Sequence, residues 1–307
     1  HPSIAMGLWE QIREGEPNHP EALSQLVGLY ERDKSWDKLA DVLEASAELA
    51  SDDTERLTLL DKLGTVCGSR LKDEQRTADV WANVLALAPE HRKAFSELRK
   101  HSLANKDWDR LEWLFRNHGS VSDLTRTLEA QAKSLTDEET VPLLKKVAAL
   151  WGEQDNVKKA VSALERVLGI EPEDADAAAQ LIPIYENLSE WGKLVDVYDV
   201  VLNSTDDLDE RRVILVAKAA LNEEQLDDLD AAFFCFVEAY KEAPRADESV
   251  RDELDRLAAA SANWEVYAAV LEAVVPTLGA EQQILTTLRV ADVQFTQLGD
   301  SEAALRH

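Results

Sequence analysis

Apolar residues recur along the chain with the spacing of amphipathic helices. Four similar phrases each begin with a tryptophan that follows a polar residue: WDKLADVL at Trp36, WDRLEWLF at Trp108, WGKLVDVY at Trp191 and WEVYAAVL at Trp264. Their shared pattern, W-x2-[LY]-x2-[VL]-[LFY], places apolar residues at positions i, i+3, i+6 and i+7. Because these positions lie on one stripe of an α-helix, each phrase predicts an amphipathic helix whose tryptophan is structural and largely buried between neighbouring units.

A second set of helical phrases alternates with the first, and each member ends at a proline. The four prolines are Pro17, Pro89, Pro172 and Pro244. Each phrase has a small residue twelve positions before its proline, a large apolar one eight before and a small or β-branched one five before. The large residues are Trp9, Trp81, Leu164 and Phe236. We expect Trp81 and Phe236 to be structural core residues, with Cys235 a small hydrophobe beside Phe236.

The spacing of these phrases defines a repeat. The prolines lie 72, 83 and 72 residues apart, and the tryptophans lie 72, 83 and 73 apart. The basic unit is therefore about 36 residues long, and alternate units differ. The eleven extra residues fall near RNHGSVSDLTRT, residues 116–127. There we expect a helix that breaks at 117–120 and restarts with Ser122 or Asp123 as its N-cap.

The small–large–small phrases that close at proline resemble the second helix of the tetratricopeptide repeat, a family with units of about 34 residues. The tryptophan phrases are also somewhat similar to half-a-tetratricopeptide repeats. The first resemblance covers almost the whole chain. It implies an all-α fold, a right-handed superhelical solenoid of antiparallel helix pairs, with residues 1–307 as one solenoid. We expect seven complete pairs flanked by a half-pair at each end, cut from a longer array so that neighbouring repeats are missing on both sides.

The family pattern also assigns the first helix of each pair. It requires a large residue, a large and a small one three and four positions later, and another large one after three more. Three helices fit, with Leu23, Leu26, Val27 and Tyr30; Leu60, Leu63, Gly64 and Cys67; and Leu144, Val147, Ala148 and Trp151. In the next copy Val216, Ala219 and Ala220 fit, whereas Glu223 breaks the last position.

The charge of the chain narrows the class of partner. Sixty acidic residues against 33 basic ones give a net charge of −27, which repels phosphate backbones, so we expect no nucleic acid partner. Apolar runs fall short of the ~18 residues of a membrane helix, and no signal peptide is visible, although the ragged ends leave room for a removed signal or anchor. Cys67 and Cys235 lack a nearby second thiol, which favours the cytoplasm.

Motifs for catalysis and metal binding are absent from the sequence. The six histidines show no H-x3-H or HExxH spacing, and there is no Cys-x2-Cys, glycine-rich phosphate loop or GxSxG motif. His19 and His91 lie 72 residues apart, which marks them as equivalent loop residues of the repeat. We therefore predict a non-enzymatic protein without cofactor or metal.

Members of the family are typically adaptors whose first helices line a concave groove for a peptide or helix. Chaperone-binding members hold a carboxylate with Lys and Asn, one and five positions after the first large residue, and no pair of residues here matches that clamp. The resemblance instead implies a groove with small and partly apolar residues for a protein or peptide partner flanked by basic residues. The expected lining is Asp61, Thr65, Lys145, Ala149, Ala217 and Leu221.

Two other functions remain open at this stage. The chain could be a regulatory repeat domain of a larger enzyme or signalling protein. It could also be an enzyme with its site in the 116–135 segment, where His118 is the acid–base group. The leading interpretation is an interaction scaffold.

Overall fold

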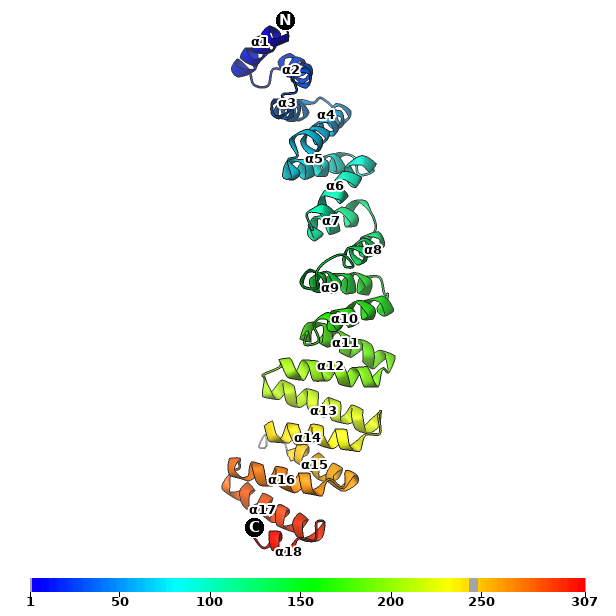
Figure 1. Ribbon diagram of the computed structural model, residues 1–307, viewed down its shortest axis with the longest axis vertical. Helices are drawn as coiled ribbons and strands as arrows, with labels where there is room; N and C mark the ends of the chain where they lie inside the picture. The colour runs from blue at the N-terminus through cyan, green and yellow to red at the C-terminus, as the bar shows by residue number, and fades with distance from the viewer. Residues whose placement is uncertain (1, 243–247, 307) are drawn as a thin grey trace. The chain divides into compact units, whose positions relative to one another are not determined.

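The computed structural model describes residues 2–242 and 248–306, and every regular element in these ranges is helical (Figure 1). His1, Pro244 and His307 lie outside the described residues. The chain forms two compact units, His1–Leu128 and Glu129–His307.

In the first unit each helix from α1 to α6 packs against the next one along the chain (Figure 1). The last turn of α4 passes into a π-helical segment, η1 (Cys67–Leu71). Helix α8 (Val121–Gln131) contains the boundary with the second unit. The helices are α1 (Pro2–Gly15), α2 (Pro20–Asp33), α3 (Trp36–Leu49), α4 (Asp53–Val66), α5 (Glu74–Leu87), α6 (Arg92–Ala104) and α7 (Trp108–His118).

The second unit continues in the same way, from α9 to α18. A short 3-10 segment, η2 (Val275–Thr277), follows α16. The helices are α9 (Asp137–Glu153), α10 (Val157–Ile170), α11 (Ala175–Leu188), α12 (Trp191–Ser204), α13 (Leu208–Glu224), α14 (Leu229–Glu242), α15 (Glu248–Ser261), α16 (Trp264–Val274), α17 (Ala280–Thr296) and α18 (Ser301–Ala304).

The predicted pairing of helices is confirmed in the described residues. The seven complete pairs are α2–α3, α4–α5, α6–α7, α9–α10, α11–α12, α13–α14 and α15–α16. Helix α1 precedes them alone, and α17 is followed by only the four residues of α18. The right-handed winding and the single-solenoid organisation stay predictions.

The two helices of each of the seven pairs, and likewise α17 and α18, are joined by a turn that contains one left-handed residue. Its φ lies between 53° and 69° at Lys34, Lys72, Lys106, Asp155, Ser189, Asp227, Ala262 and Gly299. In all but the last of these turns an L side chain adopts this conformation, which normally favours glycine. The reversal of the chain is therefore held by packing of the two helices rather than by glycine.

The opposite ends of the pairs are capped by equivalent residues. His19 and His91 both accept a hydrogen bond through Nδ1 from a backbone N–H three residues later, at 3.2 Å, so their predicted equivalence is confirmed. Asp174 holds the next such position and accepts from the Ala177 N–H at 2.9 Å. Each side chain satisfies an N–H that the first turn leaves without a helical acceptor.

Helix α8 begins at a different cap from the expected one. The Asp123 N–H donates to Ser120 Oγ at 3.1 Å, and that hydroxyl lies 2.9 Å from Asp123 Oδ2. The prediction of Ser122 or Asp123 as the N-cap was therefore wrong. Ser120 caps the helix because it stands immediately before the first helical residue, and Asp123 interacts with it from inside the first turn.

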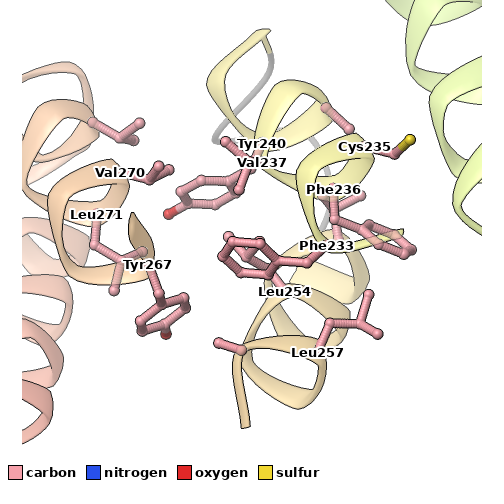
Figure 2. Close-up of a cluster of buried hydrophobic side chains, with 14 of the residues drawn as sticks. Phe233, Cys235, Phe236, Val237, Tyr240, Leu254, Leu257, Tyr267, Val270 and Leu271 are labelled. Carbon is pink, nitrogen blue, oxygen red and sulfur yellow. The ribbon is translucent and has the colours of Figure 1, made fainter. Parts of the chain in front are cut away.

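Small residues on the first helix of a pair receive the large residue of the second. A Cβ atom on Gly64 of α4 would lie 2.7 Å from the Trp81 ring of α5, so only glycine fits there. Trp81 is 1% exposed and Phe236 is 7% exposed. Phe236 belongs to a cluster that extends from α12 to α17, in which Phe233, Tyr240 and Tyr267 are also buried (Figure 2).

The four tryptophans of the repeated phrases are less deeply buried. Trp36, Trp108, Trp191 and Trp264 each stand at the first position of a helix and are half-buried. Trp36 and Trp264 pack against the hydrophobic clusters of their own units. They cover the edges of the core, whereas the Trp81 and Phe236 positions fill its interior.

Candidate functional site

The expected groove residues of the first unit already contact a neighbouring helix. Lys93 of α6 lies 2.8 Å from Asp61 Oδ2 and donates to Thr65 Oγ1 at 3.0 Å. The same ammonium lies 5.1 Å from the centre of the Trp81 ring. These contacts connect α4 to α6, so Asp61 and Thr65 serve to align successive first helices.

Lys145 has the same role in the second unit. Its ammonium lies 2.7 Å from Asp174 Oδ2 and 3.5 Å from Asp176 Oδ2, both at the start of α11. The hydrogen bond to Asp174 raises the pKa of Lys145 above its ordinary value. Ala149, one turn later on α9, is exposed and makes no such connection.

The predicted register of α13 was wrong by one residue. Leu215, Ala219 and Asn222 are buried, at 1%, 0% and 3% exposure, whereas Val216 is 36% exposed. Leu221 is only 7% exposed and Ala217 is half-buried, so the shift turns both away from the most exposed face of α13; their part in a groove stays a prediction.

The polar residues of the α13 core explain this error. Asn222 occupies the last core position, where its amide lies 3.9 Å from Cys235 Sγ. Lys218 occupies another core position, three residues after Leu215, and its ammonium donates to Asp199 of α12. The family pattern expects apolar residues at these core positions. The sequence therefore fits the register that starts at Val216 better than the true one, which starts at Leu215.

The corrected register defines a first-helix surface on the second unit. It consists of exposed residues one and five positions after the first core residue of α9, α11 and α13: Ala149, Ala179, Pro183, Val216 and Ala220. All five side chains are small or apolar. Pro183 has no N–H, so the Ala179 carbonyl lacks its helical donor and can accept a hydrogen bond from a guest.

The corresponding positions of the first unit are mostly polar. On α2, α4 and α6 they are Ser24, Gly28, Asp61, Thr65, Ser96 and Lys100. Asp61 is half-buried, as is Lys145 at the same position of α9 in the second unit. The two units therefore present first-helix surfaces of different chemistry, although their helix patterns are the same.

A series of ion pairs connects the second helices. In each case the basic residue is the third of its helix and the acidic partner lies on the preceding second helix. The pairs are Lys38–Glu10 at 2.8 Å, Arg76–Asp41 at 3.0 Å, Arg110–Asp79 at 3.6 Å and Lys193–Glu165 at 2.6 Å. Sequence reasoning missed this series, although W-x-[KR] at Trp36, Trp108 and Trp191 is its visible signal.

The described residues hold no group of three or more His, Cys, Asp or Glu side chains that could bind a metal ion. Cys67 and Cys235 are both free thiols, and burial raises the pKa of each, to about 11 for Cys235. In the described part of the chain, no helix combines the length and the apolar character that a membrane span requires.

No protein-family model and no curated protein matches the sequence. Solved structures are similar to it at low identity. The structure of Naa15/Naa10 bound to HypK-THB matches 99% of this chain and 56% of that one, with 14% identity and a TM-score of 0.38. Yeast Tom70 matches 97% of this chain and 59% of its own, with 12% identity and a TM-score of 0.28. This chain therefore spans little more than half the length of either.

The C-terminal part of a TPR repeat-containing protein from Cytophaga hutchinsonii is also similar. It matches 82% of this chain and 94% of that one, with 11% identity and a TM-score of 0.30. The paired helices, the repeat of about 36 residues and the small–large packing inside each pair resemble the tetratricopeptide repeat.

Proposed function

We propose that the chain is a non-catalytic protein–protein interaction scaffold, and that the first-helix surface of the second unit binds a helix or an extended segment of a partner. The observation that carries this proposal is the exposure of Ala149, Ala179, Pro183, Val216 and Ala220 on successive first helices. Small side chains let a guest backbone approach closely, and burial of the apolar ones against the guest stabilises the complex.

Charge supports a guest flanked by Lys or Arg. The net charge of −27 produces an acidic field that accelerates the approach of a basic segment and weakens with added salt. Lys145 remains in the proposal as a polar position on α9, which a guest reaches by exchanging the ion pair with Asp174. Asp61 and Thr65 belong to the first unit, and their part in binding stays a separate prediction. We also propose the cytoplasm as the compartment, because both cysteines are free thiols.

Two substitutions on α13 test the proposal. Val216→Glu and Ala220→Arg should each reduce partner capture from a native lysate to background, because both side chains project from the proposed surface. Phe234→Glu is the matched control, since Phe234 is 47% exposed but lies on the second helix of the same pair. Helicity and melting temperature should stay unchanged in all three. Capture that survives both α13 changes would contradict the proposal.

A further inference from the structure

A pocket of about 450 Å³ lies in the first unit between α3, α4 and α5. Its apolar wall includes Leu60, Leu63, Val80 and Leu87, and the Arg56 side chain lies among its lining residues. We call it the Arg56 pocket. It is formed by the end of α3, the 56–63 part of α4 and the second half of α5, so it is separate from the first-helix surface of the second unit proposed above.

The guanidinium of Arg56 has no carboxylate partner among the described residues. Its Nε donates to the carbonyl oxygen of Ala47 at 3.1 Å. Glu44, also in the lining, is bound instead by Arg76, at 2.5 Å. A half-buried arginine thus faces an apolar pocket with most of its N–H donors free.

The equivalent region of the second unit, 155 residues later, shows what such an arginine binds. Arg211 takes the place of Arg56 and also donates to a carbonyl at the end of the preceding helix, that of Leu202, but through Nη1 rather than Nε. In addition, its Nε and Nη2 lie 2.8 Å and 2.7 Å from Glu242 Oε1. One carboxylate of the chain therefore accepts two donors of this guanidinium.

Two substitutions between the copies account for the difference. Leu87 stands in the first unit where Glu242 stands in the second, and Leu63 stands where Lys218 stands. Lys218 is ion-paired with Asp199. The second unit therefore fills this region with two ion pairs of its own, whereas the first has leucines and a pocket.

We propose that the Arg56 pocket binds a segment of a protein partner that presents an apolar side chain next to a carboxylate. The apolar side chain packs against Leu60, Leu63 and Leu87. The carboxylate accepts hydrogen bonds from the two Nη groups of Arg56, because its Nε already donates to Ala47. Charge-assisted hydrogen bonds are among the strongest that side chains form. Glu48, exposed at the rim, selects against segments with further acidic residues.

Two short peptides that differ in one group test this assignment. Acetyl-Gly-Leu-Glu-Gly-amide and acetyl-Gly-Leu-Gln-Gly-amide are titrated into the full chain with labelled methyl groups and followed by NMR. The Glu peptide should shift the methyl signals of Leu60, Leu63, Val80 and Leu87 and bind about tenfold more tightly than the Gln peptide.

Three variants assign the effect to Arg56. Arg56→Gln should remove the preference for the Glu peptide. Leu87→Glu should abolish its binding, because it supplies the carboxylate from within the chain, as Glu242 does. Arg211→Gln is the matched control in the second unit and should leave the titration unchanged.

Four results would overturn the proposal: no shift at these methyl groups, equal affinity for the two peptides, unaltered binding to Leu87→Glu, or equal loss in Arg211→Gln. The melting temperature of each variant separates loss of binding from loss of folding. None of these results bears on the first-helix surface of the second unit, which is tested by its own variants.

Discussion

The α3–α4–α5 region of the first unit and the α12–α13–α14 region of the second share one helix pattern, but their interiors differ. In the first, Trp81 packs over Gly64; in the second, Phe236 stands where Trp81 does and Ala219 where Gly64 does. The larger ring is combined with the smaller partner. In these two pairs of helices the side chains differ but fill a similar total volume, as close packing requires.

The polar contacts of the two units are of two kinds. Some recur in both units: Tyr30 donates to Glu10 at 2.8 Å and Tyr185 donates to Glu165 at 3.1 Å. Others occur in one unit only, such as the pair of Arg211 with Glu242. The recurring contacts hold neighbouring helices together in both units. The unit-specific pair of Arg211 with Glu242 occupies the α12–α13–α14 region, where the α3–α4–α5 region of the first unit has a pocket.

The largest expected effect concerns the core positions that both regions need. Trp81→Ala and Phe236→Ala should each lower the free energy of unfolding by about 3–5 kcal/mol, because each removes a buried aromatic side chain and leaves a cavity. Urea denaturation followed by circular dichroism measures this. A loss below ~1 kcal/mol in either variant would show that the region repacks and that the two cores are not equivalent.

The next largest effect is a difference in stability between substitutions beside Arg211 and beside Arg56. Glu242→Leu should lower the free energy of unfolding by about 1–3 kcal/mol, since it leaves Arg211 with only backbone acceptors. Leu87→Glu should change stability by less than about 1 kcal/mol, because the new carboxylate pairs with Arg56. Urea denaturation of both variants tests the difference. An equal loss of stability in the two variants would contradict the proposed difference between the Arg56 and Arg211 regions.

A smaller effect depends on pH and on the recurring tyrosine contact. Burial and the hydrogen bond to Glu10 raise the pKa of Tyr30 from 10.0 to about 12. The folded state thus holds this proton more tightly than the unfolded one. The resulting stability is present below pH 10 and is lost as the pH rises through 12.

Tyr30→Phe should therefore flatten the fall of stability between these pH values. Tyr185→Phe should do the same, because burial and Glu165 also raise the pKa of Tyr185. Thermal melting of each variant across this range, compared with the unsubstituted chain, measures the contribution of each contact. An unchanged pH dependence would contradict it.

The smallest effect is on the rates of thiol labelling, and it reports on each unit separately. Cys67 is buried in the core of the first unit and Cys235 in that of the second, at 0% and 6% exposure. Because burial raises the pKa of both thiols, neither should react with a disulfide reagent at pH 8 faster than its unit opens.

Core variants should change these rates one unit at a time. Trp81→Ala should accelerate the labelling of Cys67 alone, and Phe236→Ala that of Cys235 alone. Equal acceleration of both thiols by one substitution would show that the units open together.

The sequence predicted the helix pairs because their signal is local. The small–large–small spacing needs only residues of one helix and its partner, and the repeat supplies several independent copies of it. Prediction failed where a polar side chain is buried. Lys218 and Asn222 hold core positions because Asp199 and Cys235 provide their partners, and those partners come from other helices.

The turns and caps also depend on contacts that the local sequence does not reveal. Residues such as Lys34 and Ala262 adopt a left-handed conformation that their side chains do not favour, since the packing of the two helices compensates for the strain. Ser120 rather than Ser122 caps α8, although both are cap-forming residues. The choice between adjacent candidates depends on where the preceding helix ends.

The class of fold, the repeat length and the large core residues follow from the sequence alone, because apolar periodicity records which face of each helix is buried. The candidate sites depend on tertiary structure. Which first-helix residues are exposed, and whether Arg56 faces a pocket or a carboxylate, is decided by contacts between helices tens of residues apart. Between the two copies, Leu87 and Leu63 are replaced by Glu242 and Lys218, which substitutes ion pairs for an apolar wall, and helical periodicity is the same for both.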